Sequence, residues 1–267
     1  LGSAFSGIGG FELGLERSSI PDLKTIWQIE RNEFCRKVLA RHWPNALRYN
    51  DIRQLDYSSL EVPDILCAGF PCQDFSIQAL RGKDKNQAGL KGVNSGLWYN
   101  LVKLIGILRP RIILLENVPT IINIGLPEIA GAFSSLGYDM QWTIISARSM
   151  GACHIRERWF TVAYPNRQYG KALGESWAME NTSSKKTAMS ECSSGNPGRI
   201  YPKNYWKGFP TEPGICRIDD GIPDRVDRIK ALGNAIVPAC SEYVGNCLAD
   251  SGLIDHLIPR AICGGLK

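Results

Sequence analysis

Hydrophobic and polar positions follow two different periods in the first 165 residues. Short apolar runs are typical of buried strands, and the segments between them carry apolar residues at the three-to-four-residue spacing of helices. Strands are predicted at 1–5, 25–29, 64–68, 111–115, 140–146 and 159–163, with a short one before Asp51, and helices at 11–17, 33–42, 97–108 and 126–136. Strands that alternate with helices predict an α/β fold with a mostly parallel sheet covered on both faces.

The pattern changes after Pro165. Residues 166–212 lose their periodicity and are rich in Ser, Thr, Asn, Gly and Lys, which is typical of loops. Order returns at 215–226, and a final helix is predicted from Pro238 to about Asp250. We therefore expect a main domain at 1–165, a small irregular lobe at 166–212, and a segment at 213–267 that returns to complete the main domain with a C-terminal helix.

Composition excludes several classes of protein. The chain has 267 residues, of which 44% are hydrophobic and 21% charged, so a disordered chain is excluded and one large domain with a small lobe is expected. No apolar run reaches the roughly 20 residues that span a bilayer, so an integral membrane protein is not expected. The net charge of +5 permits a polyanionic partner without requiring one. The chain begins with Leu1 rather than Met, and we expect that a few residues precede it.

The cysteines and histidines point to no metal centre. There are nine cysteines with no Cys-x-x-Cys pair, and the three histidines are far apart in sequence. We therefore expect neither a zinc site nor a disulfide framework, and we predict a reducing, intracellular compartment.

A glycine turn and two carboxylates follow the first three predicted strands. The turn Phe5–Gly10 can bring backbone close to a ligand, and Glu30, at the end of the next strand, can accept hydrogen bonds from ribose hydroxyls. Glu12 stands where a dinucleotide fingerprint has its third glycine, so a cofactor with one nucleoside and no pyrophosphate fits better. With Asp51 after the third strand, we predict a nucleoside-type cofactor; a plain tight turn is the alternative.

Three further segments carry reactive groups. Cys72 lies in a turn after the strand at 64–68 and is a candidate nucleophile, whereas Cys67 within that strand is predicted to be a buried structural residue. Glu116 ends a very apolar strand, where burial favours the protonated acid that could donate to a ring nitrogen. Arg156 and Arg158 alternate along a predicted extended segment and would present two guanidinium groups on one face to an anion or a carbonyl. A structural cysteine, a helix cap and surface salt bridges are the respective alternatives.

Taken in order, these segments resemble the C5-cytosine-specific DNA methyltransferase family over residues 1–165 and about 213–250. The segments that carry the resemblance are Phe5–Gly10, Glu30, Asp51, Pro71-Cys72-Gln73, Glu116-Asn117-Val118, Arg156-x-Arg158 and Gly233-Asn234-Ala235. The resemblance implies a Rossmann-like fold of the kind that uses S-adenosyl-L-methionine, and a target-recognition role for 166–212. Two positions depart from the family's pattern, because Arg31 stands where an aromatic residue is frequent and His154 where Gln is frequent.

The same resemblance implies residue roles. The implied cofactor contacts are Phe5, Ser6, Gly7, Ile8, Gly9, Gly10, Glu30, Asp51, Ile52, Pro71, Leu97, Asn234 and Ala235. Cys72 would attack cytosine C6, Glu116 would protonate or hydrogen-bond N3, Arg158 would contact the base carbonyl, and Arg156 would support the catalytic loop. The target base would be flipped out of the duplex. The basic segment 81–91 would close over the DNA.

The implied partners follow from the same family. They are double-stranded DNA and, as a candidate, a cognate restriction endonuclease, for a monomeric bacterial or phage-encoded enzyme in the cytoplasm that joins the nucleoid when on DNA. Two alternatives stay open: the same chemistry on cytosine C5 of transfer RNA, and a catalytically silent nucleic-acid-binding homologue. Glu12 and the pairing of Cys72 with Glu116 disfavour a nicotinamide-dependent Rossmann enzyme.

Overall fold

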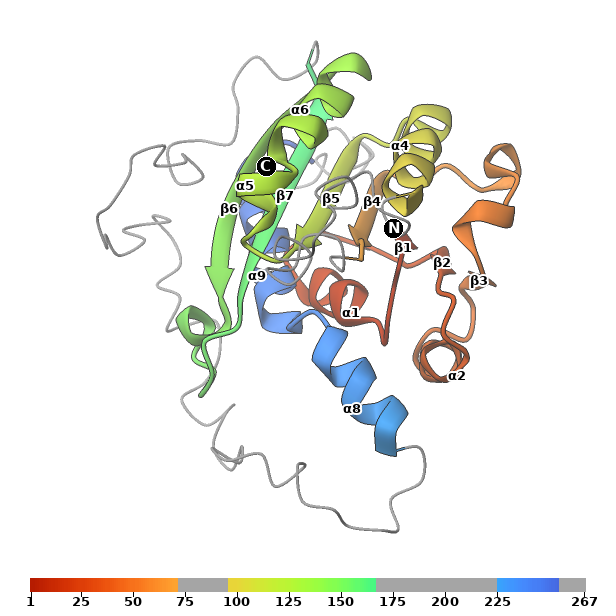
Figure 1. Ribbon diagram of the computed structural model, residues 1–267, viewed down its shortest axis with the longest axis vertical. Coiled ribbons are helices and arrows are strands. Elements are labelled where there is room, and N and C mark those ends of the chain that lie inside the picture. Colours follow the sequence, from red (N-terminus) through yellow and green to blue (C-terminus); the bar gives the residue numbers. More distant parts are fainter. Residues whose placement is uncertain (72–95, 167–224, 255–267) are drawn as a thin grey trace, which may run out of the picture.

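The fold is built around one mixed sheet of seven strands. The computed structural model describes residues 1–71, 96–166 and 225–254, and its strands lie side by side in the order β3-β2-β1-β4-β5-β7-β6 (Figure 1). Their bounds are β1 Gly2–Ala4, β2 Trp27–Ile29, β3 Leu47–Tyr49, β4 Ile65–Gly69, β5 Ile112–Asn117, β6 Tyr138–Ser146 and β7 Glu157–Pro165. The first five are parallel, whereas β7 and β6 pair antiparallel. The predicted α/β fold with a mostly parallel sheet is confirmed.

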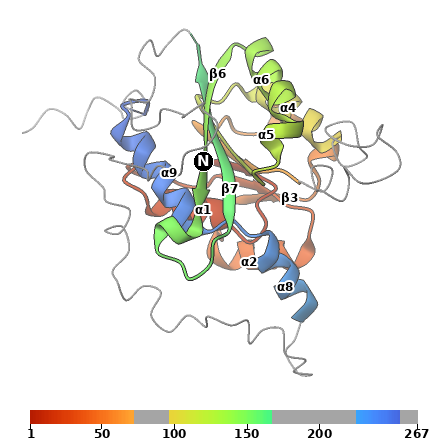
Figure 2. The ribbon, with the colours of Figure 1, turned by 60° about the vertical axis from the view of Figure 1, so that its left-hand side comes forward.

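Helices cover both faces of this sheet. Helices α1 and α9 lie on one side, and α4, α5 and α6 lie on the other (Figure 2). The bounds of the helices are α1 Gly10–Arg17, α2 Glu33–His42, α4 Gly96–Leu108, α5 Ile121–Ile124, α6 Leu126–Ser135, α8 Arg225–Asn234 and α9 Pro238–Asp250, with short 3₁₀ turns η1 Ile52–Gln54, η2 Tyr57–Ser59 and η5 Ala147–Met150. No helix of the described ranges combines the length and the apolar character needed to cross a bilayer.

Alternation along the central strands divides the core into two layers. In β4, Ile65 and Cys67 face the layer that includes α1 and α9, whereas Leu66 and Ala68 face the layer that includes α4 and α6. Side chains point to opposite faces at each step along a strand, so a strand buried on both faces reads as a continuous apolar run. Cys67 is fully buried in this layer, as predicted for a structural cysteine.

Element bounds differ from the sequence prediction at three places that matter for the site. Strand β5 continues through Asn117, two residues beyond the predicted strand at 111–115. Strand β7 begins at Glu157, so Arg156 lies before it rather than in an extended segment. Helix α8 at Arg225–Asn234 was not among the predicted helices. The expected lobe at 166–212 lies, except for Asn166, outside the described residues.

Candidate active site

The polar residues singled out above come together at one edge of the sheet. Strands β1 to β5 run parallel, so the segments that follow them emerge at the same edge. Strand β7 runs the other way, which brings its first residues to that edge, where Asn117 at the end of β5 pairs with Trp159. In open α/β sheets this edge is where ligands bind.

The glycine turn after β1 is joined to Glu30 after β2. One carboxylate oxygen of Glu30, Oε2, accepts a hydrogen bond of 2.8 Å from the Gly7 amide, and the other accepts one of 2.6 Å from the Asn32 amide. Phe5, Gly7 and Gly9 all have positive φ, at 56°, 55° and 87°. For Phe5 this is a strained conformation, of the kind that clusters at functional sites. The turn and the carboxylate therefore form one rigid unit.

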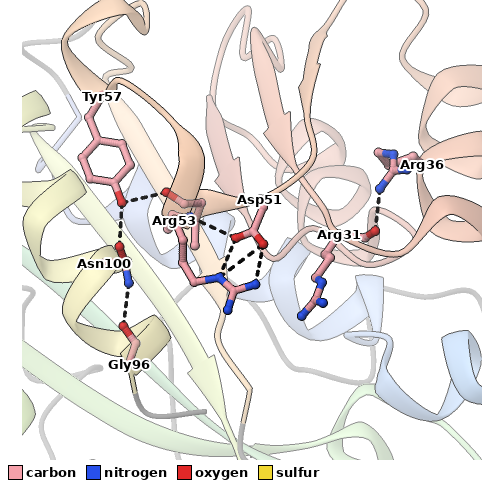
Figure 3. Close-up of polar contacts among 8 residues, drawn as sticks. Arg31, Arg36, Asp51, Arg53, Tyr57, Gly96 and Asn100 are labelled. Atoms are coloured by element: carbon pink, nitrogen blue, oxygen red, sulfur yellow. Dashed lines mark hydrogen bonds and ion pairs between the residues drawn. The ribbon is translucent and has the colours of Figure 1, made fainter. Parts of the chain in front are cut away.

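Asp51 is held as a charged acceptor by a neighbouring arginine. Arg53 approaches both carboxylate oxygens, with Nη2 at 2.6 Å from Oδ2 and Nε at 3.0 Å from Oδ1 (Figure 3). This hydrogen bonding lowers the pKa of Asp51 to about 2. Figure 3 places Arg31 on the far side of Asp51 from Arg53, and its charge acts in the same direction. The carboxylate is ionised at neutral pH and can accept a hydrogen bond from an amine.

A series of hydrogen bonds connects the turn that follows Asp51 to helix α4. Tyr57 Oη lies 2.8 Å from the Ile52 carbonyl oxygen and 3.1 Å from Asn100 Oδ1, and Asn100 Nδ2 donates to the Gly96 carbonyl at 2.7 Å (Figure 3). Ile52 is buried, while Leu97 on α4 is half-buried and packs on the same apolar layer as Phe5. These hydrogen bonds hold the start of α4 beside the turn after β3.

The connection between α8 and α9 forms a further wall. Arg156 Nη2 donates to the Gly233 carbonyl at 2.9 Å and to the Ala235 carbonyl at 2.6 Å. Arg156 has a φ of 24°, so it is not in an extended conformation and the expected shared strand face with Arg158 is wrong. Its guanidinium holds the Gly233–Ala235 segment, which includes Asn234. The segment 72–95 that Arg156 was expected to support lies outside the described residues.

This wall comes very close to the glycine turn. A Cβ added to Gly10 would lie 2.2 Å from the carbonyl oxygen of Ile236, and one added to Gly69 would lie 3.2 Å from its side chain. Glycine is required at Gly10, because backbone fills the space that a side chain would need. The segment after α8 therefore packs directly against the turn that follows β1.

Glu116 forms a buried ion pair at the same edge. Its Oε1 lies 3.0 Å from Arg158 Nε, and Glu116 is 8% exposed. Burial raises the pKa of Glu116 to about 7, although the charges of Arg158 and Arg156 oppose the shift. Near neutral pH this group therefore exists in both the acid and the carboxylate form, so it can donate a proton or accept one.

Cys72 lies outside the described residues, one position after Pro71, the last residue described before the gap. The backbone leading to it is fixed by Asn117, whose Nδ2 donates to the Phe70 carbonyl at 3.2 Å. Asn117 is 2% exposed, so this contact is sheltered from water. The described backbone that leads to Cys72 therefore leaves β4 beside Glu116, which β5 positions opposite Gly69.

Several residues of the site were not identified from the sequence. Arg53, Tyr57 and Asn100 connect the loop after β3 to α4, and Arg36 Nη1 donates to the Glu30 carbonyl at 3.0 Å. The sequence offers one local signal, because Arg53 follows Asp51 by two residues, a spacing at which a side chain can turn back onto its neighbour. The contact of Tyr57 with Asn100 joins positions 43 apart and leaves no local pattern.

These residues fit an adenosine-containing group such as S-adenosyl-L-methionine. A Cβ placed on Gly7 would meet nothing within 4 Å, so open space lies over the turn that Glu30 holds. Glu30 would take the ribose hydroxyls and Asp51 an adenine amine, since both carry acceptor oxygens. Phe5 and Leu97, both half-buried, offer apolar surface for the base. No group of three or more His, Cys, Asp or Glu side chains that could hold a metal ion occurs in the described ranges.

The seven-stranded sheet with helices on both faces is a Rossmann-like fold of the methyltransferase type, and the candidate site lies at the carboxyl ends of its parallel strands. The chain belongs to the C-5 cytosine-specific DNA methylase family, whose profile matches residues 1–208. It is 28% identical over 177 residues to the type II methyltransferase M.Bsp6I of Bacillus sp. (strain RFL6), covering 64% of this chain and 54% of that protein. It is 32% identical over 161 residues to the type II methyltransferase M.CviJI of Paramecium bursaria Chlorella virus IL3A, covering 60% and 41%.

The solved structures agree on the fold. The methyltransferase EhMeth of Entamoeba histolytica matches with a TM-score of 0.62 and 17% identity over 97% of this chain and 98% of that one. The curated relatives are longer proteins, and the chain covers about half of their length or somewhat less. The comparisons therefore establish the family and the fold.

Proposed function

We propose that the protein is a DNA (cytosine-5-)-methyltransferase that uses S-adenosyl-L-methionine. The observation that carries this proposal is the buried ion pair of Glu116 and Arg158. It lies at the same sheet edge as the glycine turn that is hydrogen-bonded to Glu30. A carboxyl with a pKa of about 7 beside a guanidinium can serve a ring nitrogen and a ring carbonyl together. Cytosine presents these two groups at N3 and O2.

The chain's residues would divide the cofactor's recognition among them. Glu30 would hold the ribose, Asp51 and Ile52 the adenine edge, and Phe5 and Leu97 its faces, while Ser6, Gly7, Ile8, Gly9 and Gly10 form the turn beneath and Pro71, Asn234 and Ala235 the remaining walls. When bound, S-adenosyl-L-methionine supplies a methyl group on a sulfonium, which is the electrophile that C5 requires. The glycine turn leaves the space open for it.

The base chemistry would rest on Cys72, Glu116 and Arg158. The Cys72 thiolate forms a bond to C6, which makes C5 nucleophilic and places charge on N3 and O2. The Glu116 acid donates its proton to N3, and Arg158 donates a hydrogen bond to O2, so both act where charge develops. Once C5 carries the methyl group, a solvent water or hydroxide takes the C5 proton, the C–H electrons form the C5–C6 double bond, Cys72 leaves as the thiolate and Glu116 takes back the N3 proton. Flipping the base out of the duplex costs a few kcal/mol.

Arg156 would act as a positioning residue. Its guanidinium binds the carbonyls of Gly233 and Ala235 and so holds the wall that packs on Gly10. It also lies close enough to Glu116 for its charge to lower the pKa of that acid. Both effects support a positioning role for Arg156 toward the cofactor wall and toward Glu116.

The remaining parts of the chain and its partners are proposed from the family. The main domain would be 1–165 with 213–267, and 166–212 would be a target-recognition lobe. The substrate would be double-stranded DNA. The curated relatives named above are type II methyltransferases, which supports a cognate restriction endonuclease as partner. We also propose a monomeric enzyme in the cytoplasm of a bacterium or a phage-infected cell, bound to the nucleoid during turnover.

The decisive test is transfer of tritiated methyl from S-adenosyl-L-methionine to unmethylated duplex DNA. We expect label in 5-methylcytosine with the unaltered protein, none with Cys72→Ser, and a loss of about 100-fold or more with Glu116→Gln. Cys153→Ser is the matched control, because this free cysteine is exposed and has no part in the proposed chemistry. Label in transfer RNA instead of DNA, or full activity of Cys72→Ser, would overturn the proposal.

A further inference from the structure

A buried polar cluster lies directly beneath the glycine turn and takes no part in the proposed chemistry. Glu12 on α1 is 0% exposed, and so is Gln28 on β2. Gln28 Nε2 donates to Glu12 Oε1 at 3.2 Å. The hydroxyl groups of Ser3 and Ser6 and the thiol of Cys67 also face the Glu12 carboxyl. Because water does not reach this carboxyl, the side chains around it determine whether it is charged or neutral.

Two oxygens in this cluster accept no hydrogen bond in the structure. These are Glu12 Oε2 and Gln28 Oε1, and both are buried. The carboxyl and the amide that carry them are already joined by the hydrogen bond from Gln28 Nε2 to Glu12 Oε1. A carboxylate offers only acceptors, so it cannot satisfy the amide oxygen. A carboxylic acid can, because a proton on Oε2 would donate to Gln28 Oε1 while Gln28 Nε2 donates to Oε1. One proton then satisfies both atoms.

We propose that Glu12 is a neutral carboxylic acid that forms a reciprocal pair of hydrogen bonds with the Gln28 amide. By joining α1 to β2, the pair positions the glycine turn Phe5–Gly10 and Glu30, which would bind the cofactor. Glu12 lies two residues after Gly10, the end of the glycine turn, and Gln28 lies two residues before Glu30. The pair thus ties α1 to β2 inside the protein, just as the Gly7–Glu30 hydrogen bond ties the turn to the end of β2 above it.

The surroundings favour the neutral acid. Burial raises the pKa of Glu12, and the hydrogen bonds that the Ser3, Ser6 and Gln28 side chains can offer oppose the shift. The Ser6 hydroxyl already donates to Ser3 Oγ at 2.9 Å. On β4, the thiol of Cys67 has its own pKa raised well above its usual value, so it stays uncharged. An ionised Glu12 would be a charge buried among neutral groups, which is costly.

The protonation state can be read by infrared spectroscopy at pH 9. Glu116, with a pKa of about 7, is ionised at that pH and does not contribute an acid band. We expect a C=O stretching band of a buried protonated carboxyl in the unaltered protein and its loss in Glu12→Gln. Absence of the band, or its persistence in Glu12→Gln, would overturn the inference, whether or not the protein methylates DNA.

The positioning role, which rests on the proposed cofactor, is tested by the affinity for S-adenosyl-L-methionine. Glu12→Gln keeps two reciprocal hydrogen bonds with Gln28, so its dissociation constant and KM should stay within about twofold of the unaltered protein. Glu12→Leu leaves the Gln28 amide unpaired and should raise both by about fivefold or more with kcat little changed. Equal affinity of the Leu and Gln variants would overturn the role. Lack of binding by the unaltered protein, with the acid band present, would instead contradict the proposed cofactor.

Discussion

At the scale of single residues, Arg158 limits how far burial raises the pKa of Glu116. The two groups are 3.0 Å apart, and the carboxyl is largely withdrawn from water. Desolvation raises the pKa of Glu116 to about 7, and the Arg158 charge is the largest effect that opposes it. Removing that charge leaves desolvation less opposed, so the acid form should persist to higher pH.

This balance predicts a shifted pH profile for Arg158→Gln. If Glu116 reacts as the acid, the single-turnover rate of methyl transfer falls as pH rises past the pKa of Glu116. In Arg158→Gln the descending limb should move to higher pH, while the maximal rate drops by roughly 100-fold because a donor to the base carbonyl is lost. Rates measured from pH 5.5 to 9 would show both effects.

A suitable control is Arg111→Gln. Arg111 pairs with Asp64 at 3.9 Å, and both side chains are largely exposed, so the control removes an arginine charge without touching Glu116. It should keep both the rate and the descending limb of the unaltered protein. A descending limb that stays in place or moves to lower pH in Arg158→Gln would contradict the account of the pair.

At the scale of elements, helices α1 and α9 pack closely against each other beneath the site. Gly14 on α1 faces the first turn of α9, where a Cβ would lie 2.1 Å from Ser241 Oγ and 2.2 Å from the Pro238 carbonyl oxygen. Ser241 Oγ in turn donates to the Gly10 carbonyl at 3.0 Å. The two helices approach this closely because a glycine stands at their contact.

Two glycine substitutions should therefore have opposite effects on stability. Gly14→Ala overpacks the α1–α9 contact and should lower the free energy of unfolding by about 1–3 kcal/mol or more. Gly131→Ala on α6, where a Cβ meets nothing within 4 Å, should raise it by up to about 1 kcal/mol through helix propensity. Urea denaturation of the two variants measures both changes. A Gly14→Ala protein as stable as Gly131→Ala would show that the helices separate more easily than their packing indicates.

The elements that could be predicted are those with local signals. Helix α2 begins where Asn32 caps it by accepting a hydrogen bond from Cys35 N, and α9 begins at Pro238 as predicted. Helix α8 was not predicted, although Val226, Ile229 and Leu232 recur at the three-residue spacing of one helix face. All three are exposed in the structure, so this apolar face is not part of the core.

The site shows the same division. The order of strands brought Glu30, Asp51 and Glu116 to one edge, which follows from parallel pairing alone. The conformation of Arg156 does not follow from strand pairing, because it depends on hydrogen bonds to the carbonyls of Gly233 and Ala235, which are 77 and 79 residues away. Contacts across such separations have no local periodicity, so the extended segment predicted for Arg156 was wrong.

At the scale of the whole molecule, the two ends of the described chain close the fold on each other. Helix α9 supplies Tyr243, Val244 and Leu248 to the same apolar layer as Phe11 and Leu15 of α1. Asn246 Oδ1 accepts hydrogen bonds from the backbone and hydroxyl of Ser19 across 227 positions. Loss of native structure at the site therefore involves both ends of the chain, and charges buried at the site act on the stability of the entire fold.

Stability should accordingly be greatest at mildly acidic pH. Glu116 has its pKa raised from 4.5 to about 7, so the folded state binds an extra proton in that range and stability falls as pH rises through it. Glu12 acts in the same direction. Asp51, with its pKa lowered from 3.8 to about 2, acts at the other end, and its contribution is lost as pH falls below about 4. The opposing signs leave a maximum between about pH 4 and 5.

The contribution of Glu116 to this slope can be isolated with Glu116→Gln. A shift from 4.5 to about 7 corresponds to on the order of 3 kcal/mol between those pH values, because each pKa unit is about 1.4 kcal/mol. Urea denaturation at pH 5, 6, 7 and 8 should show that the free energy of unfolding of the unaltered protein falls as pH rises. In Glu116→Gln it should fall less steeply, and the difference in slope should correspond to about one bound proton. Glu61→Gln, at an exposed position, should keep the original slope. Equal slopes for all three proteins would mean that the pKa of Glu116 is the same in the folded and unfolded states. The charge of Arg158 would then fully offset the effect of burial, and Glu116 would be a carboxylate at neutral pH.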